Sequence, residues 1–348
     1  MTATPLTFRH DTLGQRVLFG ANQAAEHVAA EINGRKVMVV ASPREMRRAR
    51  ELFADLKIAV WHEDVAMHVP VEVADRARGV AKQHDIDLLV AVGGGSAVGT
   101  AKAVALSTGI ELIAVPTTYA GSEATDVWGM TEQGRKTTGQ DPRVLPTAVI
   151  YDSTLTVSLP VDLSVASGLN ALAHCVDSLW APRADPINAA LATEGARALT
   201  TGLPRVHDNP VDLGGRDQLL YGAYLAAVAF ASAGAGMHHK ICHILGGTFN
   251  LPHAPTHAIV LPYVVAFNEP AAAERLGVAF GGLAGLQELR KRIDAPRALR
   301  DVGFTAAGIP EVVRQALDAV PASNPRPVTA DNLTELLTRA LVGAEPAG

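Results

Sequence analysis

The first half of the chain alternates between short runs of β-branched residues and stretches of helical character, and this alternation constrains the fold most. Strands are predicted at 36–41, 58–61, 87–92, 112–115 and 147–151, and helices at 23–32, 43–56, 71–84 and 96–106. Apolar strands separated by helices are typical of a parallel sheet that is covered on both faces. The carboxyl ends of such strands meet at one edge, where ligands bind.

After about residue 159 the β-branched runs stop, and Ala, Leu and Gly dominate. Helices are predicted at 165–179, 189–200, 216–233, 237–245, 271–280, 283–293, 310–320 and 330–342. The sequence therefore predicts an α/β nucleotide-binding domain over 1–158 and an all-helical domain over 159–348. No low-complexity linker separates them, so we expect the two domains to pack around a shared cleft.

Charge and cysteine content exclude several classes of partner. The net charge is −5 and no run of Lys and Arg is present, so we expect neither nucleic acid nor a membrane surface as a partner. The two cysteines, Cys175 and Cys242, suit a reducing compartment. The start of the chain lacks the apolar core of a signal peptide, and no apolar stretch is long enough to span a membrane. We expect a cytoplasmic protein with a small-molecule ligand.

A glycine-rich turn follows the strand predicted at 87–92. Gly93, Gly94, Gly95 and Ser96 lead directly into a helical stretch. This order places backbone N–H groups and a helix N-terminus against a phosphate, and glycines let the phosphate approach closely. An ordinary strand-to-helix turn with glycines for packing is the alternative, because the standard G-x-G-x-x-G pattern is absent.

Two further polar turns fall at the same predicted edge. Thr117, Thr118 and Ser122 follow the strand at 112–115, and Ser42 follows the strand at 36–41. Together with the glycines they predict a dinucleotide site, although Ser and Thr are also common in ordinary capped loops. No carboxylate directly follows Ser42, and Arg44 would admit a 2′-phosphate, so the cofactor is expected to be NADH or NADPH.

Five of the twelve histidines lie between 238 and 257. His239 and His243 are four residues apart and share a helix face, and Gly246 and Gly247 are expected to end that helix. His253 begins the next segment, which is expected to fold back towards His239.

Asn170 and His174 have the same spacing on another helix. Unpaired buried imidazoles cost about 1–3 kcal/mol each, so a metal or a polar substrate is the expected partner of these histidines. A neutral amide such as Asn170 is a poor ligand, and on this chemistry we expect no tightly bound metal.

These residues resemble the iron-containing alcohol dehydrogenase family, which shares the dehydroquinate-synthase-like fold. The resemblance covers nearly the whole chain. Its motifs are GGGS at 93–96, Ala101-Lys102, PTTYAGSE at 116–123, GLNALAH at 168–174 and HHKICHILGGTFNLPH at 238–253. It implies that Asn170, His174, His239 and His253 occupy the family's metal-ligand positions, and that His243 lies near the nicotinamide.

Two residues depart from the family pattern. Asn170 stands where the family has a ligand Asp, and Gly99 stands where an acidic residue is usual. Both departures look like the maleylacetate reductase branch. That branch reduces the carbon–carbon double bond of maleylacetate to 3-oxoadipate in the degradation of aromatic compounds. The resemblance also implies a homodimer without an absolute metal requirement.

We expect histidine N–H donors, chiefly His243 with His174, His239 and His253, to stabilise negative charge on the substrate ketone oxygen. One of them, or water, would protonate the adjacent carbon. Cations are needed for a dicarboxylate substrate. Lys136 and Lys240 are the preferred candidates, ahead of Arg135 and Arg143. Asn170 and Tyr119 are also expected to contact the substrate, and Trp128 is a further candidate for the pocket wall.

Three other functions stay open. A metal-dependent alcohol or aldehyde dehydrogenase would use Asn170 as a weak ligand. A lyase or cyclase similar to dehydroquinate synthase would need a full metal site and more cations than the single Lys240 beside the histidines. A non-catalytic binding protein would keep the fold and oxidise no nicotinamide cofactor.

Overall fold

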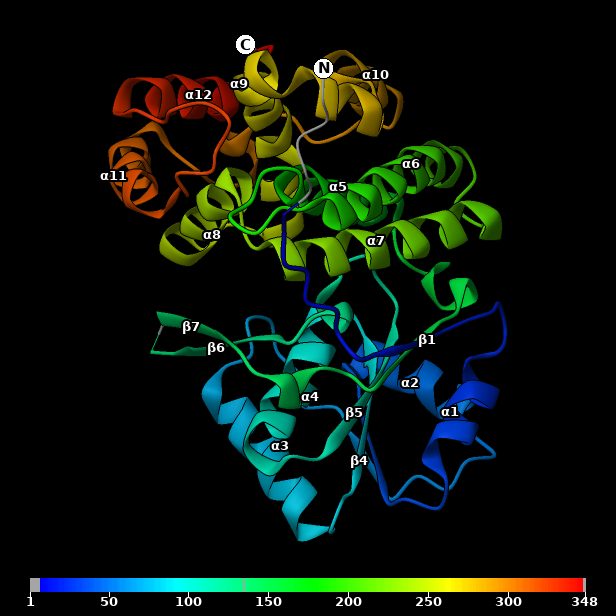
Figure 1. Cartoon of the computed structure of the whole chain (residues 1–348). Helices are drawn as coiled ribbons and strands as arrows, with labels where there is room; N and C mark the ends of the chain where they lie inside the picture. The colour runs from blue at the N-terminus through cyan, green and yellow to red at the C-terminus, as the bar shows by residue number, and fades with distance from the viewer. Residues whose placement is uncertain (1–6, 134, 347–348) are drawn as a thin grey trace.

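Six parallel strands form the sheet of the N-terminal region. The computed structural model describes residues 7–133 and 135–346, and its α/β region lies below a helical region in Figure 1. The strand order is β1-β8-β5-β4-β2-β3. The strands are β1 (Arg16–Phe19), β2 (Val37–Val40), β3 (Val60–His62), β4 (Leu88–Gly93), β5 (Glu111–Pro116) and β8 (Ala148–Tyr151). Every pairing is parallel, as predicted.

Helices cover both faces of this sheet, because successive side chains of each strand point to opposite sides. One face packs against α1 (Ala24–Ile32) and α2 (Pro43–Leu52). The other face packs against α3 (Val71–Gln83) and α4 (Gly95–Thr108). The chain leaves β2 for β3 on one side and returns to β4 on the other side. Such a switch point opens a crevice at the carboxyl ends of the strands, where ligands bind.

β1 and a second sheet were not predicted from the sequence. β1 is a half-exposed edge strand of four residues, too short to stand out as an apolar run. The second sheet is a hairpin of β6 (Val127–Glu132) and β7 (Arg135–Gln140), which projects to the left in Figure 1. Few of its residues are apolar, so its strands lack the buried pattern on which the predictions relied.

Eight α-helices from Val161 onward build the second region. They are α5 (Val161–Ser178), α6 (Pro186–Asp208), α7 (Leu213–Ala233), α8 (Met237–Phe249), α9 (His253–Phe280), α10 (Gly282–Arg292), α11 (Ile309–Ala319) and α12 (Ala330–Val342). Short 3₁₀ helices are η1 (Ser122–Ala124), η2 (Pro142–Val144), η3 (Ser153–Thr156), η4 (Leu299–Val302) and η5 (Ala306–Gly308). The region is helical as predicted. No single helix within the described ranges has the length and apolarity of a membrane span; α7 and α8 reach them only as a pair bent by 96°.

Several helix boundaries differ from expectation, and α6, for example, runs to Asp208 instead of ending at residue 200. Gly246 and Gly247 do not end α8, which continues to Phe249 and stops at Asn250 in a left-handed conformation. Glycine inside a helix costs only about 1 kcal/mol, and the packing of Phe249 against Phe304 offsets this cost. The helix predicted at 271–280 is the last part of α9, which begins at His253 and bends at a residue with non-helical backbone, Ala272.

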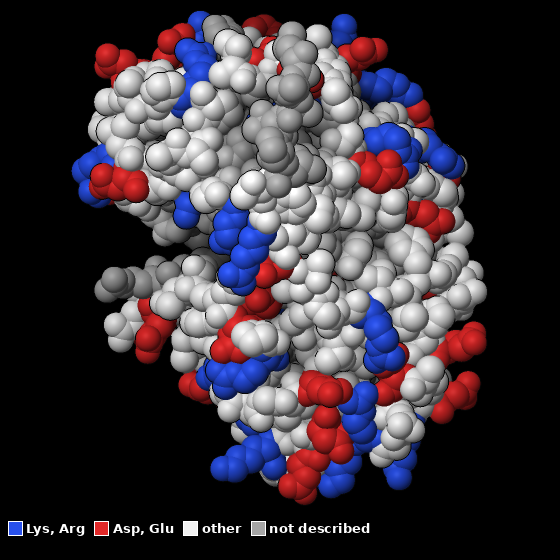
Figure 2. Space-filling view, in the orientation of Figure 1, with Lys and Arg blue, Asp and Glu red and all other residues white. Residues whose placement is uncertain are grey.

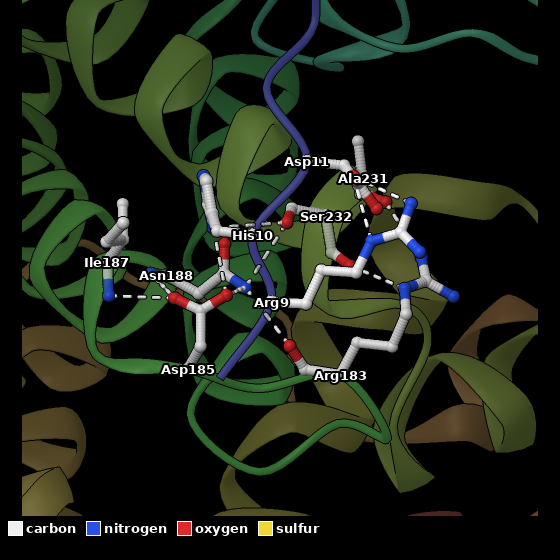
Figure 3. Close-up of polar contacts among 9 residues, drawn as sticks. All are labelled: Arg9, His10, Asp11, Arg183, Asp185, Ile187, Asn188, Ala231 and Ser232. Atoms are coloured by element: carbon white, nitrogen blue, oxygen red, sulfur yellow. Dashed lines mark hydrogen bonds and ion pairs between the residues drawn. The ribbon is translucent and has the colours of Figure 1, made fainter. Parts of the chain in front are cut away.

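The segment before β1 joins the two regions a second time. His10 donates from Nδ1 to a carboxylate oxygen of Asp185 at 2.8 Å, and the same nitrogen lies 3.4 Å from the hydroxyl of Ser232 (Figure 3). Asp185 also caps the start of α6 by accepting from the N–H groups of Ile187 and Asn188. A segment that continues into the edge strand of the sheet is therefore fixed to the helical region.

Candidate functional site

A pocket of about 330 Å³ lies at the switch point of the sheet. Its lining includes all the predicted cofactor-binding residues except Ser122, namely Ser42, Gly93, Gly94, Gly95, Ser96, Thr117 and Thr118. The main chain of Ser122 instead accepts a hydrogen bond from the Lys102 amino group at 2.7 Å. Three strand ends that are far apart in the sequence thus meet at one pocket.

Each glycine of this pocket is required for a different geometric reason. Gly93 has φ 143°, a backbone conformation that other residues rarely adopt. At Gly94, a Cβ atom would lie 2.9 Å from a methyl carbon of Thr118. The helix α4 begins at Gly95, so its first N–H groups lack partners within the helix. The pocket therefore combines free N–H groups with a helix N-terminus, as phosphate binding requires.

Charged residues at the start of α2 border the same pocket. Arg44 lines it and donates to the carbonyl oxygen of Ser158 at 3.0 Å. Glu45 also lines it, and the sequence analysis did not single it out. The helical spacing offered a signal, because Ser42 is the N-cap of α2 and binds the N–H group of Glu45. The part of the wall that the sequence did not reveal is completed by Val65, Ala97, Ser158 and Leu159.

Gly99, on α4, lies against the loop that carries Val65. A Cβ atom at Gly99 would be 2.7 Å from a methyl carbon of Val69. Val69 has φ 48° and its neighbour His68 has φ 62°, which is strained for a β-branched residue such as valine. The carbonyl of Val69 accepts from the N–H group of Thr131, near the turn of the hairpin. The absence of a side chain at position 99 therefore allows this loop to pack against α4.

The histidine cluster forms where α5, α8 and α9 meet. The rings of His174 and His239 are stacked 4.6 Å apart. The ring of His257 lies 4.7 Å from that of His239 and 4.3 Å from that of His253. His243 is 5.9 Å from His239, again between ring centroids. The four histidines that the sequence singled out are thus brought together, and His257, which it did not single out, lies between them.

Asp177 fixes the orientation of the His239 ring. This buried carboxylate, one turn after His174 on α5, accepts from Nδ1 of His239 at 2.8 Å. It also accepts from the N–H groups of Gly236, His238 and His239. Burial raises the pKa of Asp177 to about 7, while these N–H groups favour the charged form. The proton of a neutral His239 is therefore on Nδ1, and Nε2 presents a lone pair to a ligand.

Burial keeps the inner imidazoles neutral. It lowers the pKa of His174 to about 3 and that of His238 to about 4. The pKa values of His239 and His257 fall well below the usual value for the same reason, with neighbouring histidines as further causes. By contrast, the side chains of His243 and His253 are exposed. The inner histidines thus present neutral donors and acceptors rather than a group of cations.

Several polar atoms of the cluster are buried without a hydrogen-bond partner in the protein. They are Oδ1 of Asn170, Nδ1 of His174, Nε2 of His239 and both ring nitrogens of His257. Unpaired buried polar groups cost about 1–3 kcal/mol each. Such a set within one cluster is typical of a site that completes its hydrogen bonds with a ligand.

The donor set fits a firmly held divalent metal ion poorly. Asn170 is a buried neutral amide, and the carboxylate nearest to His239 is Asp177, which is occupied by Nδ1 of that ring and by backbone N–H groups. Among the described residues, the ring nitrogens of His238, His239 and His257 lie within 4.8 Å of one another. Two of their nitrogens are already used, because Nδ1 of His239 is bound to Asp177 and Nε2 of His238 lies 3.0 Å from the carbonyl oxygen of His257.

The residues expected to bind the substrate lie in different surroundings. Lys240 is half-buried on α8 beside His239. Tyr119, expected in the pocket wall, is fully buried and its hydroxyl accepts from Arg216, so that expectation is wrong. Its ring is drawn into the helical core, which a pattern of polar turn residues did not indicate. The side chains of Arg135 and Lys136 lie outside the described residues.

The other two candidates also have local partners. Arg143 is exposed and pairs with Asp141 at 2.7 Å. Trp128 packs against Gly139 across the hairpin, where a Cβ atom would lie 2.6 Å from its ring. Figure 2 shows the surface hollowed between the two regions, on the side where the hairpin projects. Acidic and basic side chains are mixed on the visible face.

Comparison with known proteins gives matches along the whole chain. Residues 14–153 match the family model for iron-containing alcohol dehydrogenase, and residues 164–341 match the C-terminal model of the Fe-containing alcohol dehydrogenase family. A maleylacetate reductase from Sphingobium indicum is 43% identical over 98% of this chain and 99% of its own length.

Solved structures agree with this assignment. An iron-containing alcohol dehydrogenase from Corynebacterium glutamicum is 59% identical, covers 99% of both chains and has a TM-score of 0.97. A maleylacetate reductase from Agrobacterium tumefaciens is 40% identical, covers 98% of this chain and 100% of its own, and has a TM-score of 0.93. The chain therefore belongs to the iron-containing alcohol dehydrogenase family of NAD(P)H-dependent oxidoreductases, within which it groups with the maleylacetate reductases.

Proposed function

We propose that this enzyme reduces the carbon–carbon double bond of maleylacetate, giving 3-oxoadipate, with NADH or NADPH and without a catalytic metal ion. The observation that carries this proposal is a cluster of neutral imidazoles and the amide of Asn170 where a metal site would need an anionic ligand. The identity of 43% to a maleylacetate reductase over 98% of the chain supports the substrate.

The reaction places negative charge on the ketone oxygen of the substrate. The pocket at the switch point would hold the reduced nicotinamide cofactor, which would supply the hydride that the alkene carbon β to this ketone receives. Neutral N–H groups then stabilise the oxygen, as in other sites where preorganised donors replace water. His243, His253 and His174 are the donors we propose. His239 is expected to accept rather than donate, because its Nδ1 proton is bound to Asp177. This refines the set of donors expected from the sequence.

The adjacent carbon must then gain a proton from water or from one of the histidines that face the substrate. The substrate is a dianion, and Lys240, one residue from His239, is the cation that we propose for one carboxylate. Asn170 offers its amide N–H₂ group to the same substrate.

The decisive experiment follows absorbance at the nicotinamide band with maleylacetate, with and without a chelator. We expect rapid oxidation of the reduced cofactor at the same rate in both cases. Oxidation that stops in the chelator and returns with added metal would contradict the metal-independent mechanism. Activity on simple alcohols alone would contradict the substrate.

A metal-dependent alcohol or aldehyde dehydrogenase is the second candidate. Asp177 holds His239 as carboxylates hold metal-ligating histidines, with the Nε2 lone pair turned away from the carboxylate. Metal content of the purified protein, together with activity on alcohols, separates this candidate from the first.

We also infer that the enzyme works in the cytoplasm as a homodimer, in the degradation of aromatic compounds. Both cysteines are free and buried, which suits a reducing compartment. Light scattering coupled to size-exclusion chromatography tests the dimer.

A further inference from the structure

Arg216, near the start of α7, is the largest completely buried side chain among the described residues. Its guanidinium donates to the carbonyl oxygen of Pro210 at 2.8 Å and to those of Val157 and Leu159 at 3.4 Å. Its fourth partner is the hydroxyl of Tyr119 at 3.0 Å. Within the described ranges, each hydrogen-bond acceptor of Arg216 is thus a neutral oxygen. Burying a cation without an anionic partner costs free energy. The burial of Arg216 therefore calls for a functional explanation in addition to packing.

Tyr119 lies in the middle of the loop that follows β5, and this residue is fixed to two helices at once. Its backbone N–H group donates to the hydroxyl of Ser167 on α5 at 3.1 Å. Its ring is buried in the helical core, and its hydroxyl accepts from Arg216 on α7. Burial raises the pKa of Tyr119, so the phenol stays neutral. The loop is therefore fixed at its central residue through both the backbone and the side chain.

The two ends of this loop belong to the two halves of the site. Thr117 and Thr118 line the cofactor pocket. Gly121 packs against the helical region, where a Cβ atom would lie 2.8 Å from Cβ of Ala227 and 3.7 Å from Cε1 of His174. The loop thus spans the separation between the cofactor pocket and the histidine cluster, and Tyr119 lies between its ends.

We propose that Arg216 and Tyr119 are positioning residues that set the separation between the bound nicotinamide ring and the histidine cluster. The proposal rests on the function proposed above. The planar guanidinium holds the loop through Tyr119 and the pocket wall through Leu159. Both sides of the pocket are therefore hydrogen-bonded to the same helix, α7. A displacement of about 1 Å by a remote substitution costs on the order of a hundredfold in rate. Loss of the guanidinium fork therefore acts on hydride transfer before it acts on binding.

Three variants test this role. Arg216→Met keeps the apolar stem, Arg216→Lys keeps the charge but not the fork, and Tyr119→Phe removes only the hydroxyl. The readouts are kcat, the KM for NADH, and the primary isotope effect with NADH deuterated at the transferred position. Arg205→Met is the matched control, because Arg205 is exposed and pairs with Asp212 at 2.8 Å. Thermal unfolding checks that each variant folds.

We expect Arg216→Met to lower kcat about a hundredfold and to enlarge the isotope effect, with the KM for NADH changed by less than about threefold. Tyr119→Phe should lower kcat about tenfold in the same direction. Arg216→Lys should fall between Arg216→Met and the wild type. Unchanged kcat and isotope effect in variants that only melt earlier would overturn the proposal. Full recovery by Arg216→Lys would overturn it too, because charge and not geometry would then be responsible.

A second measurement separates this inference from the proposed function. The emission maximum and lifetime of bound NADH report the surroundings of the nicotinamide without any substrate. We expect both to differ from the wild type in Tyr119→Phe and Arg216→Met at similar affinity. Wild-type protein that binds NADH but does not reduce maleylacetate would overturn the function alone. Identical emission in the wild type and in both variants would overturn the positioning role alone.

Discussion

The cofactor pocket and the histidine cluster differ in what supplies their polar groups. The pocket is made of strand ends, glycines and hydroxyl side chains, and it offers backbone N–H groups at the start of α4. The cluster is made of side chains from three helices, most of them buried, and several of the buried polar atoms have no protein partner. The pocket therefore depends on the path of the backbone, whereas the cluster depends on the chemistry of individual side chains. Substitutions in the two halves should affect different kinetic constants.

The largest effect is expected at the cluster, from Asp177→Asn. The amide would place its own N–H donors against backbone N–H groups that now donate to the carboxylate. It would also weaken the hydrogen bond that holds His239. We expect kcat to fall about a hundredfold and the free energy of unfolding to fall by about 3 kcal/mol. Steady-state kinetics and chemical unfolding measure both. Asp162→Asn, at an exposed position of the same helix, is the control and should match the wild type.

The next effect sharpens the comparison through metal binding. Asn170→Asp would add an anionic ligand beside the imidazoles of His174 and His239, and we expect affinity for Zn²⁺ to rise about a hundredfold. Competition with a chromophoric chelator measures this affinity. An Asn170→Asp variant that binds Zn²⁺ no more tightly than the wild type would show that the amide does not determine the metal affinity.

A pocket substitution should have the opposite kinetic signature. Gly94→Ala brings a methyl group to 2.9 Å from Thr118, which forces the backbone away from the phosphate site. Strain of about 1–2 kcal/mol corresponds to a KM for NADH raised about tenfold, with kcat nearly unchanged. Gly79→Ala, where a Cβ atom meets nothing within 4 Å, is the control. A fall in kcat without a change in KM would break the proposed division between the two halves.

The smallest effect is expected from Arg44→Ala at the exposed edge of the pocket. An exposed ion pair contributes about 1 kcal/mol at most, so the KM for NADPH should rise about threefold to fivefold. The KM for NADH should stay the same, because NADH has no 2′-phosphate. Equal changes for both cofactors would show that Arg44 acts through its contact with Ser158 and not through the phosphate.

The difference between the two halves also explains what the sequence could predict. The parallel sheet follows from apolar runs such as residues 87–92, and the pocket follows from the turns after them, because parallel strands end at one edge. Ser122 was misplaced because a hydroxyl near a strand end does not reveal which side of the loop it occupies. Glu45 was not predicted because it lies in the first turn of α2, several residues beyond the end of β2.

The cluster was only partly predictable. Helical spacing paired His239 with His243 and Asn170 with His174, and His253 was expected to fold back towards His239. The resemblance to a family joined these positions into one site. Asp177 was missed because a single acidic residue in a helix is usually exposed, although its spacing from Asn170 and His174 places all three on one face. The buried position of Tyr119 and the continuation of α8 past Gly246 depend on tertiary packing, which local patterns do not contain.

The contact between Gly99 and Val69 limits how this chain can change over evolutionary time. A carboxylate cannot be placed at position 99 while the methyl group of Val69 occupies the same space. Relief at position 69 alone would leave the strained loop without its support. Acquisition of the acidic residue therefore requires coordinated changes in two segments, and ancestral reconstructions should find the two positions substituted together.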